Sequence, residues 1–394
     1  MQRMTALDHI SHLVETIGPR GSTNPEEAAA ATYASDQLSA MGLTPHTQKF
    51  LGAESAYAPY ALFAGSTLLS IVLFWRPQPV GAAAAALLAG VVLASLLLEM
   101  QFIANVLRWL LRVDDSQNVH ARISASAAPA AQTVVITAHL DTHRTPLIFS
   151  SPTWQKVFSL LMPAGLISAA LLLVLFVVGI FMPAPVLRWA SLAPGAVILA
   201  ILLLMLQADN TPFTRGADDN ASGVGVVLSL AQRLQQAPLA HTDVIIVFTG
   251  CEEVACYGAD AFMTEHAAEL RGAIHLTIDQ VGARGANPCV VRGEQFFVPA
   301  HGDARLLAIA DAVIARRPDL NISTRSLHGA YGELSIGVKH GLRAIAIGAL
   351  NAEGVSPNWH KPTDDMSNID PQVVERCEAL AWELLQDFDA AARG

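Results

Sequence analysis

The sequence predicts an α/β protein in which a mostly parallel mixed sheet carries helices on both faces and is interrupted by membrane-spanning helices. Two observations lead to this prediction. Short apolar runs rich in β-branched residues alternate with helical patterns, which is typical of a largely parallel sheet covered on both faces. The 394-residue chain also has only 15% charged residues and a mean hydropathy of +0.40. This apolar excess falls mostly in four long uncharged runs.

The alternation of strands and helices can be followed along the chain. Residues 1–20 show an amphipathic helical pattern. Asn24-Pro25-Glu26-Glu27 predicts a helix start with Asn24 as N-cap and Glu27 in the reciprocal capping position, and this helix ends near Met41. Strands are predicted at 134–138, 244–249, 274–278, 290–292 and 344–347. Helices are predicted at 224–234, 259–270 and 304–315, and a last helix runs from Asp370 through Ala391.

The four uncharged apolar runs occupy residues 55–75, 77–98, 157–187 and 189–206. Each has the roughly 20 residues that a helix needs to cross ~30 Å of hydrocarbon. Buried core helices are the alternative, but uncharged runs of this length are rare in soluble cores. Tight turns at 76–79 and 183–188 join the runs into two helical hairpins, so the sequence predicts four transmembrane helices.

One of these runs carries small residues at i, i+4 spacing, namely Ala82, Ala86, Gly90 and Ala94. Such a stripe lets another helix approach closely in lipid, so we expect a homo-oligomer through the transmembrane helices. Simple alanine richness explains the stripe equally well. The amphipathic segment 101–112 is expected to lie along the membrane surface.

The charge pattern predicts a location. Residues 1–20 lack the continuous apolar segment of a signal peptide. Basic residues flank the runs on the side of the polar domain: Arg108, Arg112, Arg144, Lys156 and Arg215. Only Arg76 and Arg188 lie in the far turns, and the positive-inside rule therefore predicts a cytoplasmic catalytic domain. The four cysteines form neither a disulfide framework nor a zinc pattern, and a net charge of −10 argues against a nucleic-acid partner.

Five candidate metal ligands lie in separate motifs. They are His139 in AHLDTH, Asp219 in GADDNASG, Glu253 in GCEEV, Asp279 in TIDQVG and His360 in NWHKPTDD. Several follow predicted strands directly, where sites form in open α/β sheets. Two imidazoles and three carboxylates suit two Zn²⁺, since one bound hydroxide would then make the cluster neutral and act as the nucleophile of a hydrolase.

Each motif also has a plainer interpretation when it is taken alone. Acidic residues before a helix, as at Asp219, are commonly caps. Adjacent acids such as Glu252 and Glu253 are usually solvated, although here an apolar strand precedes them. A single loop histidine such as His360 is most often at the surface, and the same holds for Asp364. The combination of motifs therefore carries the metal-site prediction.

Together these motifs resemble the co-catalytic di-zinc aminopeptidases, the family that also holds glutamate carboxypeptidases, glutaminyl cyclases and transferrin-receptor-like domains. The resemblance begins at ETIGPRGSTNPEEAAAATYASDQLSAMG and continues through NVHARI, HLDTH, GADDNASG, FTGCEEVACYGADAF and WHKPTDDMSNID. It covers essentially all of the chain except the hairpins. It implies the zinc exopeptidase fold and a zinc peptidase domain built from residues 1–54, 113–145 and 210–394. Hairpin 1 with the amphipathic segment (55–112) and hairpin 2 (156–208) would be insertions.

The resemblance also implies roles for individual residues. His139 and Asp279 would bind one zinc, and Glu253 and His360 would bind the other. Asp219 would bridge the two ions and would precede a cis peptide bond to Asn220. Glu252 would be the general base, and Asp141 would orient His139. The chain departs from the family near HGAYGELSIGVKHGL, where many relatives have a Ser-Asp-His element. Tyr331 or His328 in this segment is a candidate substrate-binding group.

The expected function is a membrane-embedded di-zinc aminopeptidase that acts on peptides, including apolar or membrane-associated ones. A glutaminyl-cyclase-like acyl transferase with one zinc is an alternative, as is a non-catalytic receptor or scaffold domain. Retention of all five ligands speaks against both. Transport is disfavoured because the four runs contain no acidic, basic or histidine side chain for an ion path.

Overall fold

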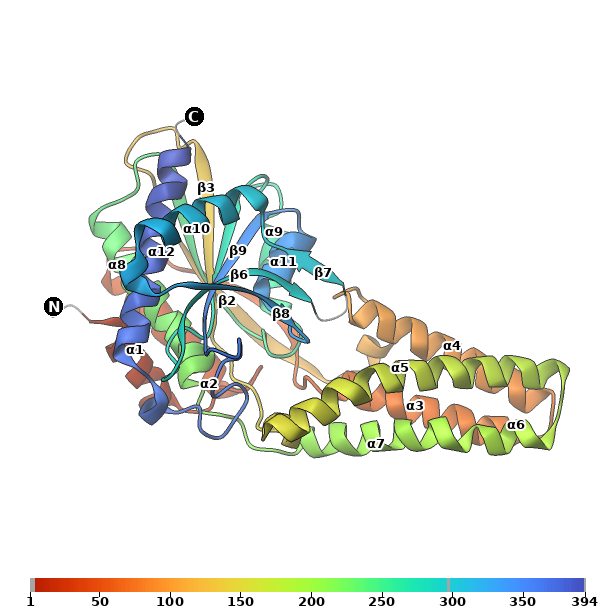
Figure 1. Ribbon diagram of the computed structural model, residues 1–394. Coiled ribbons are helices and arrows are strands. Elements are labelled where there is room, and N and C mark those ends of the chain that lie inside the picture. The colour runs from red at the N-terminus through yellow and green to blue at the C-terminus, as the bar shows by residue number, and fades with distance from the viewer. Residues whose placement is uncertain (1–3, 296–297, 393–394) are drawn as a thin grey trace. The chain divides into compact units, whose positions relative to one another are not determined.

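The computed structural model describes residues 4–295 and 298–392, which form two compact units (Figure 1). We call residues 1–54, 113–143 and 213–394 the sheet unit, and residues 55–112 and 144–212 the helical unit. All five candidate metal ligands belong to the sheet unit. Each unit is described separately below.

The sheet unit contains a nine-stranded sheet. The strands are β1 (His46–Ala53), β2 (Val113–Ile123), β3 (Gln132–His139), β4 (Thr242–Thr249), β5 (Ile274–Ile278), β6 (Asn287–Gln295), β7 (Pro299–His301), β8 (Ser323–His328) and β9 (Arg343–Leu350). Their order is β1-β2-β4-β3-β5-β9-β6-β7, and β8 pairs with β6. The central strands β4, β3, β5 and β9 run parallel, so their carboxyl ends meet at one edge.

The prediction of a mostly parallel sheet was too strong. Strands β1, β2, β6 and β7 pair antiparallel, so the described strands make four parallel and four antiparallel pairings. The five predicted strands were all found, but β1, β2, β7 and β8 were not predicted. These four lie outside the parallel centre, and β1 exposes half of its eight side chains, so it lacks the continuous apolar run of a buried strand.

Helices cover both faces of this sheet (Figure 1). The helices are α1 (Ala6–Ser11), α2 (Pro25–Ala40), α8 (Gly223–Gln236), α9 (Tyr257–Glu265), α10 (Ala304–Arg316), α11 (Glu333–Lys339) and α12 (Pro371–Ala391), with π-helical turns at His12–Ile17 and Ala217–Ser222. Helices α2, α8, α10 and α12 form one layer, while α9 and α11 pack together on the sheet as the other. Helix α9 ends at Glu265, five residues earlier than predicted.

The start of α2 differs in detail from the predicted capping box. Asn24 is the N-cap, but its side chain makes no capping hydrogen bond. Glu27 is buried and accepts hydrogen bonds from the backbone N–H of Thr23 (3.0 Å), the backbone N–H of Cys251 (2.8 Å) and the hydroxyl of Ser116 (2.8 Å). Burial raises the pKa of Glu27 to about 7. This carboxyl group therefore links α2 to the turn after β4 rather than only closing its own helix.

The helical unit consists of α3 (Ala58–Phe74), α4 (Val80–Glu99), α5 (Pro152–Phe181), α6 (Pro185–Ala190) and α7 (Leu192–Asp209), with 3-10 turns at Val106–Leu110 and Leu147–Phe149. Helix α3 packs against α4 and α7, and α5 packs against the same two helices. Among the described residues, three helical stretches are long and apolar enough to cross a membrane: Val80–Glu99, Pro152–Phe181 and Pro185–Asp209. The fourth predicted span is the shorter apolar helix Ala58–Phe74, of 17 residues.

The buried small residues of α4 follow a slightly different line along the helix from the predicted stripe. Ala82, Ala85 and Ala89 are buried, whereas Ala94 of the predicted stripe is exposed. An α-helix has 3.6 residues per turn, so a strict i, i+4 line drifts around the helix and leaves the contact. The close helix contact predicted for α4 is therefore made within this chain, along a slightly different line.

Candidate metal centre

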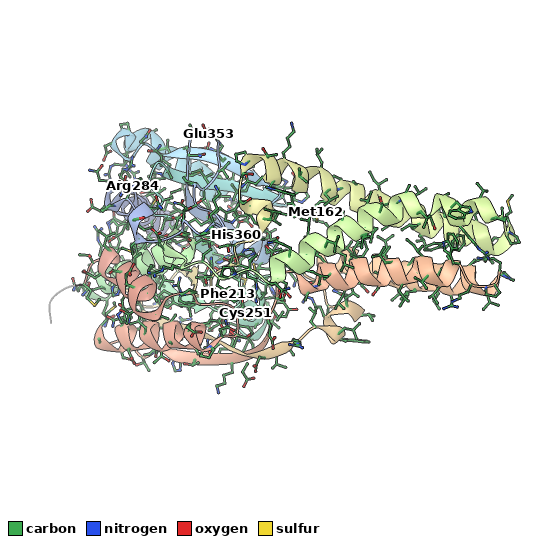
Figure 2. The ribbon with its side chains drawn as sticks, turned by 90° about the horizontal axis from the view of Figure 1, so that it is seen from below. Met162, Phe213, Cys251, Arg284, Glu353 and His360 are labelled. Atoms are coloured by element: carbon green, nitrogen blue, oxygen red, sulfur yellow. The ribbon has the colours of Figure 1, made fainter. Side chains whose placement is uncertain are left out.

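The candidate centre lies where neighbouring parallel strands end. His139 is the last residue of β3, Glu252 and Glu253 follow β4 after a two-residue turn, and Asp279 follows β5. These three strands are adjacent in the sheet and parallel, so their carboxyl ends converge. Asp219 comes from the turn before α8, and His360 from the loop between β9 and α12. Figure 2 labels His360 among the side chains of the sheet unit.

The five predicted side chains form a continuous chain of close contacts. His139 Nε2 lies 3.2 Å from Asp219 Oδ1 and 3.3 Å from Asp279 Oδ1. His360 Nε2 lies 3.4 Å from Asp219 Oδ2 and 3.3 Å from Glu253 Oε2. The two oxygens of Asp219 thus face two different imidazoles, which is the arrangement of a carboxylate that bridges two cations. Asp279 is the most exposed of the five, with 28% of its side chain accessible.

The Asp219 turn is held by its neighbours in the sequence GADDNASG. Asp218 accepts hydrogen bonds from the backbone N–H of Gly282 (2.8 Å) and the hydroxyl of Ser356 (2.9 Å), which belong to the loops that carry Asp279 and His360. Asp364 in turn accepts the backbone N–H groups of Asp218 and Asp219. The surface interpretation of Asp364 was therefore wrong, because this side chain is buried beneath the turn. The peptide between Asp219 and Asn220 is cis, as the resemblance implied.

Asp141 links two of the ligand-bearing loops. Its Oδ1 lies 3.4 Å from His139 Nδ1, the position expected of a group that orients the imidazole. Its carboxylate also accepts the backbone N–H groups of Glu252 (3.0 Å) and Glu253 (3.1 Å) and the hydroxyl of Ser22 (2.7 Å). Asp141 therefore fixes the turn after β4 as well as the ring of His139.

Arg20 is a buried side chain whose role the sequence did not indicate. Its guanidinium donates five hydrogen bonds to backbone carbonyls, those of Leu13, Gly18, Leu140, Arg215 and Gly216. These carbonyls belong to the N-terminal helical segment, the loop after β3 and the turn before Asp219. Arg20 consequently ties the His139 and Asp219 loops to the same anchor.

Several carboxylates lie close together in the centre, and burial makes their negative charges unfavourable. Desolvation and the charge of Asp219 raise the pKa of Glu253 well above its usual value. Burial lowers the pKa of His139, but the nearby carboxylates, Glu252 first, outweigh burial and hold this pKa above its usual value. One carboxylate oxygen of Glu253, Oε1, is buried without a hydrogen-bond partner. Such an arrangement requires positive charge to balance it.

Glu252 differs from Glu253 in its surroundings. Burial raises its pKa well above the usual range, and the charges of Glu253, Asp279 and Asp141 add to this effect, while His139 opposes it. The buried thiol of Cys256 donates to Glu252 Oε1 at 3.2 Å. Glu252 also forms one of the clusters that could hold an ion, together with His139 and Glu253. A carboxyl group of raised pKa at this position can both accept and deliver a proton.

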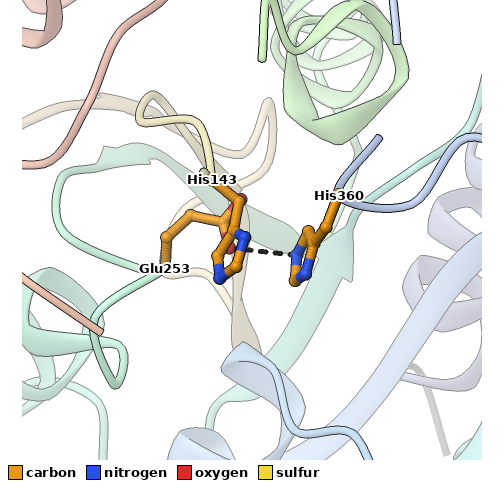
Figure 3. A group of neighbouring side chains, drawn as sticks. All are labelled: His143, Glu253 and His360. Carbon is orange, nitrogen blue, oxygen red and sulfur yellow. Dashed lines mark ion pairs between the residues drawn. The ribbon is translucent and has the colours of Figure 1, made fainter. Parts of the chain in front are cut away.

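The structure adds His143 to the predicted set (Figure 3). This side chain is buried, and its ring stacks on that of His360 with 3.5 Å between ring centres and 11° between planes. His143, Glu253 and His360 form one of the clusters of potential metal-ligating atoms. The sequence contained a signal for it, since HLDTH has a second histidine four residues after the first. The other two candidates differ in exposure, since His328 is exposed at the end of β8 and Tyr331 is half-buried before α11.

The residues present fit a zinc centre. Carboxylate oxygens and imidazole nitrogens are ordinary zinc ligands, and here they meet within 3.2–3.4 Å of one another. His139, Asp219 and Asp279 form one potential ion-binding cluster, and Glu253 with His360 belongs to another. The unpartnered oxygen of Glu253 offers a further acceptor.

Comparison with known proteins agrees with this geometry. The model described as Peptidase family M28 matches residues 200–385. A vacuolar membrane protease of Clavispora lusitaniae is 24% identical over 170 residues, which is 43% of this chain and only 16% of that protein. The chain therefore spans a small part of the length of this curated relative.

Solved structures share the fold. A zinc aminopeptidase from Bacillus subtilis aligns with a TM-score of 0.57 at 14% identity, covering 97% of this chain and 94% of its own. A Zn-dependent exopeptidase from Parabacteroides distasonis gives 0.56 at 14%, covering 98% and 96%. A glutaminyl cyclase from Tannerella forsythia gives 0.55 at 15%, covering 97% of both chains. These likenesses show a shared fold, and the model described as Peptidase family M28 matches residues 200–385, a little under half of the chain.

Proposed function

We propose that the chain is a membrane-embedded di-zinc aminopeptidase. The observation that carries the proposal is the position of Asp219, whose two carboxylate oxygens lie 3.2 and 3.4 Å from the Nε2 atoms of His139 and His360. A carboxylate shared in this way suits two ions held side by side. His139 and Asp279 would hold one ion, and Glu253 and His360 the other. When bound, zinc would lower the pKa of a water molecule and polarise the carbonyl group that is attacked.

The protein's own residues would then manage protons and orientation. Glu252 would take a proton from the attacking water and deliver it to the leaving amine, because its buried carboxyl group has a raised pKa. Asp141 would hold the ring of His139 and the backbone of Glu252 and Glu253 in place through the contacts described above. The exposed side of Asp279 marks the open edge of the centre, from which a peptide would enter.

The test combines metal content with substrate choice. We expect elemental analysis of the purified chain to give two zinc ions per chain, and we expect hydrolysis of aminoacyl-anilides but not of peptides with blocked N-termini. One ion per chain with full activity would contradict the di-zinc proposal and favour cyclase-like acyl transfer. Cleavage of blocked peptides would contradict aminopeptidase specificity, and absence of both metal and activity would favour a receptor or scaffold.

We propose further that the helical unit spans the bilayer and that the sheet unit faces the cytoplasm. The three long apolar helices and the membrane-protease relative support the first statement, and the excess of Arg and Lys on one side of the runs supports the second. Labelling of single engineered cysteines, one at exposed Thr44 and one at exposed Pro77 in the turn before α4, would test the orientation in intact cells. Labelling of the Thr44 position from outside the cell would contradict it.

The chain path suggests which peptides are cleaved. Only eight residues separate His143 from the start of α5 at Pro152, a distance of at most roughly 30 Å even when fully extended. We propose that the substrates include apolar or membrane-associated peptides, which the bilayer would concentrate near the site. The intact protein should then cleave a long apolar peptide faster in lipid vesicles than in detergent, while a small aminoacyl-anilide shows no such preference. If the ratio of the cleavage rate in vesicles to the rate in detergent is the same for both substrates, this role of the membrane is contradicted.

A further inference from the structure

A second histidine cluster lies on the sheet unit, outside the candidate metal centre. It consists of His46 on β1, His120 on β2 and His266 at the C-terminal end of α9. The three side chains line a cavity of about 530 Å³, which none of the five predicted metal ligands lines. Three imidazoles from three different elements thus converge on one opening.

The register of the sheet brings the first two histidines together. His46 and His120 are direct partners in the antiparallel pairing of β1 with β2, so both side chains project from the same face. Their ring centres are 5.5 Å apart. His266 lies over the same face, and its ring centre is 5.1 Å from that of His120. Phe262 packs against the rings of both His120 and His266, which restricts their rotation.

These separations are those of imidazoles that share a metal ion. A tetrahedral ion with Zn–N bonds of 2.0–2.1 Å keeps two bound imidazole rings roughly 5 Å apart between centres. His120 has this spacing to each of the other two rings. The three nitrogens do not all lie within 4.8 Å of one another as they stand, as they do in the clusters of the candidate metal centre. The exposed side chain of His46 must rotate to bring its nitrogen close enough to share one ion with His120 and His266.

One contact of His266 is typical of a metal-binding histidine. Its Nδ1 lies 3.0 Å from Glu269 Oε2, and Glu269 also pairs with Arg122. A carboxylate that takes the Nδ1 hydrogen leaves the lone pair on Nε2, which is the arrangement commonly found behind metal-binding histidines.

We propose that His46, His120 and His266 form a second metal site, separate from the candidate catalytic centre, that binds a divalent transition metal such as zinc. Three neutral imidazoles with a carboxylate behind one of them suit zinc, copper or nickel rather than calcium or magnesium, which prefer oxygen ligands. A water molecule would take the fourth position. The site does not depend on the function proposed above.

The test counts zinc on the full-length protein in detergent. The protein is dialysed against buffer that contains a fixed concentration of free zinc, and bound zinc is measured by elemental analysis. We expect the unaltered protein to hold one more zinc per chain than the His120→Asn and His266→Asn variants do. The exposed His301 lies on β7, outside the cavity, so His301→Asn is the matched control and should bind as much zinc as the unaltered protein.

A second measurement separates loss of the site from loss of the fold. Excess zinc should raise the Tm of the unaltered protein and of His301→Asn more than that of the two cluster variants, while all four cleave the same small substrate at similar rates. Equal zinc content in the unaltered protein and both cluster variants would overturn the proposal. Loss of one zinc in His301→Asn as well would also overturn it, because the effect would not be specific to the cluster.

Discussion

The two units of this chain differ in where their large apolar and their charged side chains lie. Of the 28 large apolar side chains that are exposed among the described residues, 25 belong to the helical unit and three, Leu51, Val113 and Val298, belong to the sheet unit. The sheet unit instead buries charged groups such as Arg20, Asp141 and Asp364 and satisfies them with hydrogen bonds. Many exposed apolar side chains are expected of a surface that faces lipid. Few exposed apolar side chains are expected of a surface that faces water.

The difference predicts where each unit is vulnerable. In the sheet unit, a buried polar group that loses its partners becomes a large penalty, since water cannot reach it. In the proposed bilayer setting, close packing of small residues would hold the helices of the helical unit together, because lipid removes the hydrophobic drive between helices. Polar contacts there gather at helix ends, as in the Arg108–Glu99 pair at 2.8 Å. The four predictions below test this contrast, beginning with the largest expected effect.

Arg20→Met should have the largest effect, because it removes five hydrogen bonds to backbone carbonyls, three of them buried. We expect the free energy of unfolding of the sheet unit to fall by about 3–5 kcal/mol in urea titration, with loss of bound metal. Arg122→Met is the control. Arg122 is 40% exposed and pairs with Asp243 at the surface, so its loss should cost about 0–1 kcal/mol. Similar losses in both variants would mean that the buried network is not a special source of stability.

Separate substitutions of the two adjacent glutamates should distinguish a loss of proton transfer from a loss of metal binding. Glu252→Gln should lower kcat by roughly 10²-fold or more and leave the metal content unchanged, because only the group that handles protons is altered. Glu253→Gln should instead weaken metal binding, since Glu253 lies 3.3 Å from His360 and has a free carboxylate oxygen. Both variants need steady-state kinetics and elemental analysis on the same preparation. The reverse outcome would exchange the two roles.

The sequence predicted the parts of the centre that follow buried strands. β3 and β4 are largely apolar, so the polar residues at or just after their ends, such as His139 and Glu252, stand out. Apart from Asp141, it did not predict the residues that support them. Asp364 resembles any surface acid until the fold brings the N–H groups of Asp218 and Asp219 to it. Three of the five partners of Arg20, namely Leu140, Arg215 and Gly216, likewise come from distant parts of the chain, and no local pattern records such contacts.

Acid should weaken the sheet unit through His275, which is buried in β5 beside Thr137, 3.0 Å from its hydroxyl. Burial lowers the pKa of His275 to about 3. The unfolded chain takes up a proton near pH 6.5 and the folded one does not, so stability is full above pH 6.5 and falls as the pH drops toward 3. At pH 5 the loss should be about 2 kcal/mol relative to pH 7.5. His275→Asn should remove this part of the pH dependence in urea titrations, whereas exposed His301→Asn should not; an unchanged pH dependence in His275→Asn would contradict the assignment.

The smallest expected effect concerns the helical unit and has opposite signs at two glycines. A Cβ atom at Gly179 of α5 would lie 2.4 Å from the ring of Phe74 on α3, a contact that the packed helices must relieve by moving apart. A Cβ at Gly90 of α4 would meet only Leu173, at 3.9 Å. Both changes to alanine gain about 1 kcal/mol of helix propensity, but overpacking at Gly179 costs about 1–3 kcal/mol. Thermal unfolding in detergent should therefore show a lower Tm for Gly179→Ala and an equal or higher Tm for Gly90→Ala. If both variants shifted in the same direction, packing of small residues would not be what holds these helices together, and the contrast between the two units would rest on their outward surfaces alone.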